Sequence, residues 1–382
     1  MQMAIYNETL FRTCTMKFSA RTRHIDISGI RKMFEASGAE TINLGLGQPD
    51  FDTPEHIKEA AIKAVQEGFT GYTENLGMLE LREAIVEKFQ QENNIYTAPG
   101  QVIVTAGASE ALHIALQSII EEGDEVLIPN PGFVSYSALT HIAEGRPKDL
   151  PLSENLTVSP ETVAEQITPK TRAIIINSPG NPTGAVQTKD EIKGVCEVAE
   201  DHDLTIVSDE VYEHIIYEGE HISPSEYTEN VITINATSKT YAMTGWRIGY
   251  ATAPVDVIEQ MAKIHQYIQA CATSISQKAA LAALTGPQDC VEEMRIEFLK
   301  RRNLLLKGFD EMGIKYLHPK GAFYAFPEVT NAEEMVQRFL RHGVITTPGT
   351  AFGSHGSGHI RFSYATSQKK IEQALMIIKD IL

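Results

Sequence analysis

Five short apolar runs alternate with helical segments between residues 101 and 235, and this alternation constrains the fold more than any other feature of the sequence. The runs are continuously apolar, as expected for strands that are covered on both faces. The segments between them repeat apolar residues at helical spacing. This order predicts an open α/β sheet with mostly parallel strands. The predicted strands span residues 101–105, 125–128, 172–177, 204–208 and 231–235.

The chain before and after this region has a different character. A short helix is expected within 21–35, followed by an irregular loop over 41–54 that is rich in glycine and proline. A helix then begins at Pro54, with Thr53 available as its cap. Further helices are predicted at 79–93, 109–120, 133–143 and 189–200. The last third predicts a smaller α+β domain, with helices at 291–312 and 368–382 and short strands at 314–317, 322–326 and 360–363.

Charge and cysteine content exclude several classes of protein. The 382 residues carry a formal net charge of -17, which argues against nucleic acid or an anionic membrane as the main partner. The four cysteines have no paired spacing, so they predict neither a disulfide framework nor a metal site. The first 15 residues lack the apolar core of a signal peptide, and no apolar run approaches membrane-spanning length. We therefore expect a cytoplasmic protein.

Lys239 lies just past the end of the last apolar run, in the stretch NATSKTYAMTGWRIGY. It is surrounded by small residues and glycines, without an acidic partner nearby in the sequence. An amine desolvated in a pocket has a lowered pKa and can form a Schiff base. Ser238 and Arg247 would suit a phosphate group beside that amine. An aldehyde that carries a phosphate indicates pyridoxal phosphate, whereas an ordinary loop lysine is the alternative interpretation.

Other polar residues also follow the ends of predicted strands, where ligands gather in open α/β sheets. Gly107, Ala108 and Ser109 open a helix and would present backbone N–H groups to a phosphate. Asn181 lies in a loop that prolines and glycines hold in place. Asp209 would pair with a protonated pyridine nitrogen, and Tyr212 would donate to the oxygen of the same ring. Each feature also has a structural interpretation, as a tight turn or a helix cap.

Two further residues are candidates for contacts with the cofactor ring and the substrate. Phe133 follows Pro-Asn-Pro-Gly and would stack on the ring, although phenylalanine at this spacing is also a common core residue. Arg361 lies inside an apolar strand, where a guanidinium needs an acidic partner or a ligand. It would bind a substrate carboxylate in a bidentate manner.

Taken together, these motifs resemble the class I/II aminotransferases, which are fold-type I pyridoxal-phosphate enzymes. The similarity is to the gamma subgroup, which includes archaeal and thermophilic aspartate aminotransferases, and it spans roughly residues 20–382. The motifs that carry it are Gly107-Ala108-Ser109, NPTG at 181–184, SDEVY at 208–212, SKTYAMTGWRIG at 238–249 and RFSYA at 361–365. The resemblance implies a large domain over 51–285 with a mixed, mostly parallel sheet covered by helices. Residues 16–50 and 286–382 would form the small α+β domain, and residues 1–15 an N-terminal arm.

The resemblance also implies a role for each residue that matches a family motif. Lys239 would be the Schiff-base lysine and proton shuttle, Asp209 the partner of the pyridine nitrogen, and Asn181 and Tyr212 the partners of the ring oxygen. Arg361 would bind the α-carboxylate, helped by the backbone at Gly47. The residues that would hold the phosphate are Gly107, Ala108, Ser109, Ser238 and Arg247, with Tyr72 reaching across a homodimer interface to the neighbouring subunit's site.

The expected activity is amino transfer from an aspartate-type or aromatic L-amino acid to a 2-oxo acid such as 2-oxoglutarate, by a ping-pong mechanism. Phe133 departs from the tryptophan of the aspartate-specific enzymes, so we expect a broad donor range. A C–S β-lyase or other Cα-bond chemistry on the same fold is the alternative, and a non-catalytic pyridoxal-phosphate-binding regulator is a more remote one. A dinucleotide-dependent oxidoreductase is disfavoured, because Pro49 follows Gly45 and Gly47 too closely for a helix-opening glycine turn.

Overall fold

The computed structural model describes residues 17–23, 25, 29 and 41–382. Its largest feature is a seven-stranded sheet with the order β2-β8-β7-β6-β5-β3-β4. Only β8 runs antiparallel to its neighbours, so the other six strands point in one direction. The strands are β2 (Val102–Thr105), β3 (Glu125–Asn130), β4 (Arg146–Pro151), β5 (Thr171–Asn177), β6 (Thr205–Asp209), β7 (Val231–Ala236) and β8 (Gly249–Thr252). The mixed, mostly parallel sheet expected from the sequence is confirmed.

Helices cover both faces of this sheet, as the apolar character of the strands predicts. In β5, Ile174 and Ile176 belong to the core beneath α7 (Pro160–Gln166) and α8 (Lys189–Asp201). Ile175, which points the opposite way, joins the core beneath the helices of the other face. Those helices are α5 (Ala108–Ile119), α6 (Ser135–Ile142) and α10 (Val255–Ile268). A third core packs the edge of β2 and β8 against α3 (Glu55–Gln66), α4 (Leu79–Asn93) and α11 (Ser274–Thr285).

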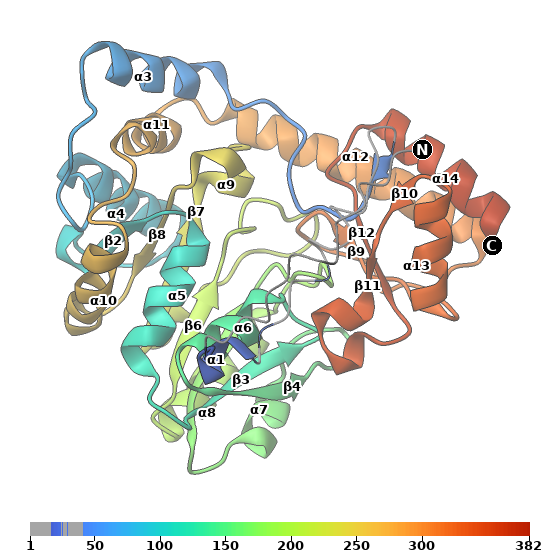
Figure 1. Ribbon diagram of the computed structural model, residues 1–382, viewed down its shortest axis with the longest axis horizontal. Helices are drawn as coiled ribbons and strands as arrows, with labels where there is room; N and C mark the ends of the chain where they lie inside the picture. Colours follow the sequence, from blue (N-terminus) through green and yellow to red (C-terminus); the bar gives the residue numbers. More distant parts are fainter. Residues whose placement is uncertain (1–16, 24, 26–28, 30–40) are drawn as a thin grey trace.

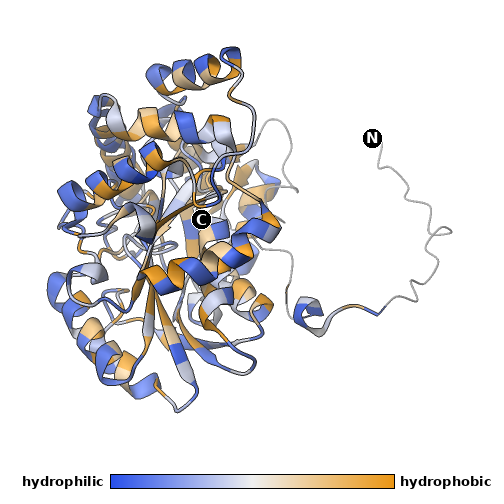
Figure 2. Cartoon of the chain, turned by 90° about the vertical axis from the view of Figure 1, so that its left-hand side faces the viewer, coloured by the Kyte–Doolittle hydropathy of each residue, from blue (hydrophilic) through white to orange (hydrophobic). Residues whose placement is uncertain are grey.

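The C-terminal elements gather to one side of the large sheet (Figure 1). Here α12 (Asp289–Met312) packs along α14 (Gln368–Ile381), and α13 (Ala332–Arg341) lies beside them. The strands are short: β9 (Tyr324–Ala325), β11 (Thr347–Pro348) and β12 (Ile360–Ser363) form one sheet, and β1 (Ile42–Asn43) pairs with β10 (Val344–Ile345). The outer helices carry hydrophilic and hydrophobic residues on different sides (Figure 2). The pairing of β1 with β10 joins residues 42–43 to the C-terminal third of the chain.

Two predictions made from the sequence are wrong. Residues 314–317 do not form a strand, since only Lys315 makes an isolated bridge, to Glu328. Thr53 does not cap α3. Its hydroxyl instead donates to the carbonyl of Ala242 and accepts from the indole of Trp246, so it ties the start of α3 to the loop after Lys239.

The sequence analysis also missed two strands of the sheet. β4 contains two prolines and lies at the edge of the sheet, where a missing N–H costs no ladder hydrogen bond. β8 is hidden in the glycine-rich stretch after Arg247. The other helices and strands predicted between 54 and 382 are present, with ends that differ by a few residues. The short helix α1 (Ala20–Arg23) falls in the predicted helical segment 21–35, most of which lies outside the described residues.

Candidate active site

The carboxyl ends of β2, β5, β6 and β7 open onto a cavity of about 230 Å³. It lies where this edge of the sheet meets β9 and β12 of the C-terminal elements. The predicted site residues that line it are Gly47, Ala108, Ser109, Phe133, Asn181, Asp209, Tyr212, Ser238, Lys239, Arg247 and Arg361. Residues that are far apart in the sequence are therefore brought together in one cavity.

Gly107 lies directly behind the cavity and supports its wall. Its φ of +80° favours glycine, and a Cβ there would lie 2.5 Å from Nη2 of Arg247. Gly249 of β8 likewise allows a close contact with the start of α5, because a Cβ at Gly249 would lie 2.6 Å from the backbone nitrogen of Ala108. These glycines let the guanidinium of Arg247 come close to the N-terminus of α5. Backbone N–H groups, a helix N-terminus and a guanidinium form a suitable set of donors for a phosphate.

Lys239 is carried by the short helix α9 (Thr237–Thr240), which follows β7 without a linker. Its Nζ donates to the carbonyl of Gly47 at 2.7 Å. Burial lowers the pKa of Lys239 to about 8, and the charges of Arg247 and Arg361 add to this effect against the opposing carboxylate of Asp209. A substantial fraction of this amine is therefore neutral near neutral pH, as a nucleophile requires.

Asp209 ends β6 and is buried. Its Oδ2 accepts a hydrogen bond of 2.7 Å from the hydroxyl of Tyr136, while Oδ1 has no partner among the described residues. Burial raises the pKa of Asp209 to about 6, although the hydrogen bond from Tyr136 opposes the rise. An unpaired buried carboxylate oxygen costs free energy unless a donor meets it. A protonated ring nitrogen in the cavity would supply that donor.

Arg361 is almost fully buried, with 1% of its surface exposed, and has no acidic partner among the described residues. One Nη donates to Oδ1 of Asn181 at 2.8 Å and the other to the carbonyl of Gly45. Its Nε has no partner within the part of the chain that the structure describes. A buried guanidinium with only neutral partners keeps an uncompensated charge, and a carboxylate ligand would balance it.

Tyr72 is the predicted site residue that the structure does not bring into the cavity of its own chain. Its side chain is 87% exposed, in the loop before α4. The loop is held on the surface, since the backbone N–H of Thr73 contacts Cys271 and the amide of Asn75 donates to the carbonyl of Ala270. Tyr72 therefore does not line this chain's cavity, and its exposed side chain can contact another molecule.

Among the lining residues that the sequence analysis did not name, three form side-chain hydrogen bonds with predicted site residues. Tyr136 donates to Asp209, Asn177 orients the loop that holds Asn181, and Tyr324 contacts the hydroxyl of Tyr212 at 2.8 Å. Tyr136 lies three residues after Phe133, which was a weak signal at most. Tyr324 acts through a contact with a residue distant in sequence, so no local pattern marks it. Asn177 contacts both Asn181, four residues later, and the carbonyl of Asp209 at the end of the neighbouring strand.

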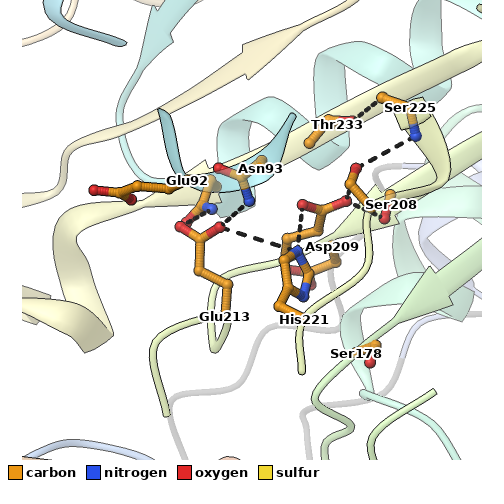
Figure 3. A network of polar contacts seen from close by, with 12 residues as sticks. Glu92, Asn93, Ser178, Ser208, Asp209, Glu213, His221, Ser225 and Thr233 are labelled. Atoms are coloured by element: carbon orange, nitrogen blue, oxygen red, sulfur yellow. Dashed lines mark hydrogen bonds and ion pairs between the residues drawn. The ribbon is translucent and has the colours of Figure 1, made fainter. Parts of the chain in front are cut away.

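A buried network of ion pairs and hydrogen bonds around Glu213 and His221 lies beside the turn that begins at Asp209 (Figure 3). Glu213 accepts hydrogen bonds from Lys88 of α4, from Asn93 at 2.6 Å and from Asn235 of β7 at 2.6 Å. Burial alone would raise the pKa of Glu213, but Lys88 and the neighbouring histidines lower it to about 2.

Glu210, one residue after Asp209, accepts from Ser208 and Ser223 and contacts His221 at 2.8 Å. Oxygen and imidazole atoms of these side chains lie close enough to hold a metal ion. Lys88 already neutralises Glu213, however, so we interpret the cluster as an ion-pair network that fixes this turn to α4 and β7.

The sequence pattern of the family described as "Aminotransferase class I and II" matches residues 39–378. The chain is 50% identical over 372 residues to a probable aspartate aminotransferase of Methanocaldococcus jannaschii, covering 95% of this chain and 99% of that one. It is 43% identical over 383 residues to aromatic-amino-acid aminotransferase 2 of Thermococcus litoralis, covering 96% and 98%. A solved aspartate aminotransferase of Thermus thermophilus with maleate superimposes with a TM-score of 0.93 at 39% identity, covering 96% and 100%.

The chain belongs to the class I and II aminotransferases. It is an enzyme of fold type I that uses pyridoxal phosphate. The described residues of this aminotransferase fit the cofactor on two counts. The unpaired Oδ1 of Asp209 suits the ring nitrogen, and Gly107 lets Arg247 lie against the N-terminus of α5, which gathers donors that suit a phosphate. In the described part of the chain, no helix is long and apolar enough to cross a membrane.

The lowered pKa of Lys239 predicts how fast the protein without cofactor reacts with pyridoxal phosphate. The neutral amine reacts, so the rate should rise about tenfold between pH 7 and pH 9 and then level off. Rapid-mixing absorbance measurements on the aminotransferase freed of cofactor would follow the reaction. Lys239→Arg, as the control, should give no stable absorbance change. A rate that keeps rising at the same slope beyond pH 10 would contradict the lowered pKa.

The buried network around Glu213 predicts that replacing this residue lowers the stability of the fold by a large amount that depends on pH. Glu213→Gln removes the nearer, buried counter-charge of Lys88 and leaves it only the partly exposed Glu92 at 3.6 Å, so unfolding should become easier by about 3 kcal/mol at pH 7. Because folding lowers the pKa of Glu213, its stabilising contribution is present above pH 4.5, the ordinary pKa, and is lost as pH falls toward 2. Denaturant unfolding at several pH values would measure both effects.

The exposed Glu333→Gln serves as the matched control and should change stability by no more than about 0.5 kcal/mol. In the double variant Lys88→Met with Glu213→Gln, both charges are removed, so its loss should be smaller than the sum of the two single losses. Equal stability of Glu213→Gln and wild type at pH 7 would show that the network contributes nothing.

Proposed function

We propose that this aminotransferase accepts aspartate-type and aromatic L-amino acids as donors and passes the amino group to 2-oxoglutarate. Relatives named for aspartate, for aromatic amino acids and for aspartate and prephenate support this range. The observation that carries the proposal is the position of the Lys239 amine, which lies between the carboxylate of Asp209 and the guanidinium groups of Arg247 and Arg361.

We assign the central chemical roles to Lys239, Asp209 and Tyr212. Pyridoxal phosphate supplies an aldehyde that condenses with amines and a ring that accepts electrons released at the substrate's Cα. Lys239 holds the cofactor and then moves the proton at Cα, for which its lowered pKa is suited. Asp209 keeps the ring nitrogen protonated. Tyr212 and Asn181 donate to the ring oxygen, since both are buried with polar atoms at the cavity.

We assign the phosphate to the N-terminus of α5 and to the residues around α9. Gly107, Ala108 and Ser109 offer backbone N–H groups and a hydroxyl, and Ser238 offers a second hydroxyl. Arg247 is exposed and, among the residues that the structure describes, donates only to the backbone carbonyls of Thr244 and Ala106. Its guanidinium therefore keeps donors for a phosphate, which would exchange weak contacts for charge-assisted ones.

The substrate would bind between Arg361 and the ring. Arg361 takes the α-carboxylate, Asn181 holds the guanidinium in place, and the backbone at Gly47 lies beside Lys239. Phe133 stacks on the cofactor ring and lies edge-on to Tyr136, with ring centroids 5.6 Å apart. The apolar surface that Leu46 and Phe133 add to the cavity suits an aromatic donor.

We also propose the domain division expected from the sequence, with a large domain over 51–285 and a small one from 16–50 and 286–382. Leu44 belongs to the apolar core around α12, α13 and α14, which supports placing this N-terminal segment in the small domain. The same core also includes Val211, Tyr212, Ile215 and Ala236, so it forms the contact with the large domain as well. A reducing, cytoplasmic environment is in keeping with Cys196, Cys271 and Cys290, which are free thiols.

A screen of amino acids in the half-reaction tests the activity and the donor range. The enzyme loaded with pyridoxal phosphate should lose the absorbance of the bound aldehyde form with aspartate and with aromatic donors, and 2-oxoglutarate should restore it. In a separate sample of the loaded enzyme, borohydride reduction should attach the cofactor permanently to Lys239, as peptide mass mapping would show. Lys239→Ala should abolish the borohydride-trapped peptide and should slow the absorbance change of the half-reaction by at least about 10³-fold. Inertness toward every amino acid would overturn the assignment, and release of a thiol from a cysteine conjugate would favour a β-lyase.

We propose a homodimer in which Tyr72 reaches the partner's phosphate, and subunit mixing tests it. Tyr72→Phe lacks the hydroxyl and Lys239→Ala lacks the reactive amine, so each variant should be impaired alone. In mixed dimers one site regains both groups, and statistical mixing should restore about a quarter of wild-type activity. If Tyr72 served its own subunit's site, mixing would restore no activity.

A further inference from the structure

Tyr324 has a hydroxyl and a ring that contact two different parts of the active site. It opens β9, its side chain is 1% exposed, and it lines the cavity from the C-terminal side. Asp209, Tyr212 and Lys239 approach from the large sheet on the other side. The sequence analysis assigned no role to Tyr324.

The hydroxyl of Tyr324 is fixed on two sides. Its oxygen lies 2.8 Å from the hydroxyl oxygen of Tyr212. On the other side it lies against the backbone of Gly47, where an added Cβ would be 2.0 Å from it. The carbonyl of Gly47 is in turn the acceptor for Lys239 at 2.7 Å. Glycine at position 47 thus leaves room for the hydroxyl of Tyr324 beside that of Tyr212.

The ring of Tyr324 supports Arg361. The guanidinium carbon of Arg361 lies 4.5 Å from the centroid of the Tyr324 ring and 4.7 Å from that of Phe352. Two aromatic rings therefore hold the guanidinium, and its hydrogen bond to Asn181 fixes its direction. Cation–π contacts of a desolvated guanidinium are stabilising and restrict its position.

We propose that Tyr324 is a positioning residue that links the substrate's carboxylate site at Arg361 to the hydroxyl of Tyr212 at the cofactor's ring oxygen. The inference rests on the roles proposed above for Tyr212 and Arg361. Either hydroxyl can donate in this contact, and the proposal takes Tyr324 as the donor, which leaves the Tyr212 proton directed at the cofactor. Through its ring, the same side chain fixes the group that receives the substrate.

The charges around the two phenols support this link. Burial raises the pKa of Tyr324 and of Tyr212, and Arg361 opposes the rise in both. The negative charge of Asp209 also raises the pKa of both phenols. The Nζ of Lys239 is a further charged group nearby, 6.0 Å from the centroid of the Phe323 ring. A carboxylate bound at Arg361 would cancel its charge and weaken both phenols as hydrogen-bond donors.

Two substitutions at Tyr324 separate the hydroxyl from the ring. Tyr324→Phe removes the contact with Tyr212 and keeps the ring beside Arg361, whereas Tyr324→Leu removes both. Tyr364→Phe is the matched control, because Tyr364 is equally buried, donates to the carbonyl of Ala322, and does not line the cavity. If Tyr324→Leu fails to fold, Tyr324→Met replaces the ring with a flexible side chain of more similar size. Each variant is studied as the enzyme loaded with pyridoxal phosphate.

The first measurement is the pH at which the absorbance of the bound cofactor changes. With a weaker donor at Tyr212, the cofactor bound to Lys239 should keep its proton to a higher pH. Tyr324→Phe should therefore raise the midpoint by about half to one pH unit above that of Tyr364→Phe. A purely structural role would not move this midpoint.

The second measurement separates kcat from KM for the amino donor. Tyr324→Phe should lower kcat with a change in KM of less than about threefold, since the ring still holds Arg361. Tyr324→Leu should in addition raise KM about tenfold. The proposal is overturned if the midpoint of Tyr324→Phe equals that of Tyr364→Phe, or if KM of Tyr324→Leu equals that of wild type. Wild-type enzyme that shows no half-reaction would instead refute the proposed function, independently of Tyr324.

Discussion

The site depends on how the chain from Asp209 to Glu213 alternates between two environments. Asp209 and Tyr212 face the cavity, while Glu210 and Glu213 point into the buried network behind it. The ion pair of Glu213 with Lys88 ties this turn to α4, and its bond with Asn235 ties it to the end of β7. Lys239 follows that strand end by four residues. Asp209 and Tyr212, which line the cavity, are therefore held in place by ion pairs and hydrogen bonds of residues that do not line it.

Much of the site was readable from the sequence, because parallel strands deliver their carboxyl ends to one edge. Gly107, Asn181, Asp209 and Lys239 each follow a strand that the apolar runs predicted, and their proximity follows from the sheet alone. The resemblance to a family then gave the chemistry that no single motif gave. Local pattern and global topology agree here, which is the condition under which sequence reasoning succeeds.

What the sequence did not reveal depends on contacts between distant segments. Lys88 lies in an amphipathic helix among other charged residues, where a solvated lysine is the ordinary expectation, yet its side chain is 5% exposed. The hydroxyl of Tyr324 fits its position only because residue 47, which lies 277 positions earlier in the chain, is a glycine. Thr53 precedes a helix as a cap would, but its hydroxyl is engaged by Ala242 and Trp246. In each case tertiary structure overrides a sound local expectation.

The cavity also shows why net charge is a poor guide to what a protein binds. The chain carries a formal net charge of -17, yet the cavity is lined by Lys239, Arg247 and Arg361 against the single carboxylate of Asp209. Three cations that face one cavity repel one another, and this repulsion helps to lower the pKa of Lys239. A phosphate and a carboxylate would relieve it at the two arginines. The repulsion that adds to the effect of burial on Lys239 therefore also attracts the two anionic groups that would surround it.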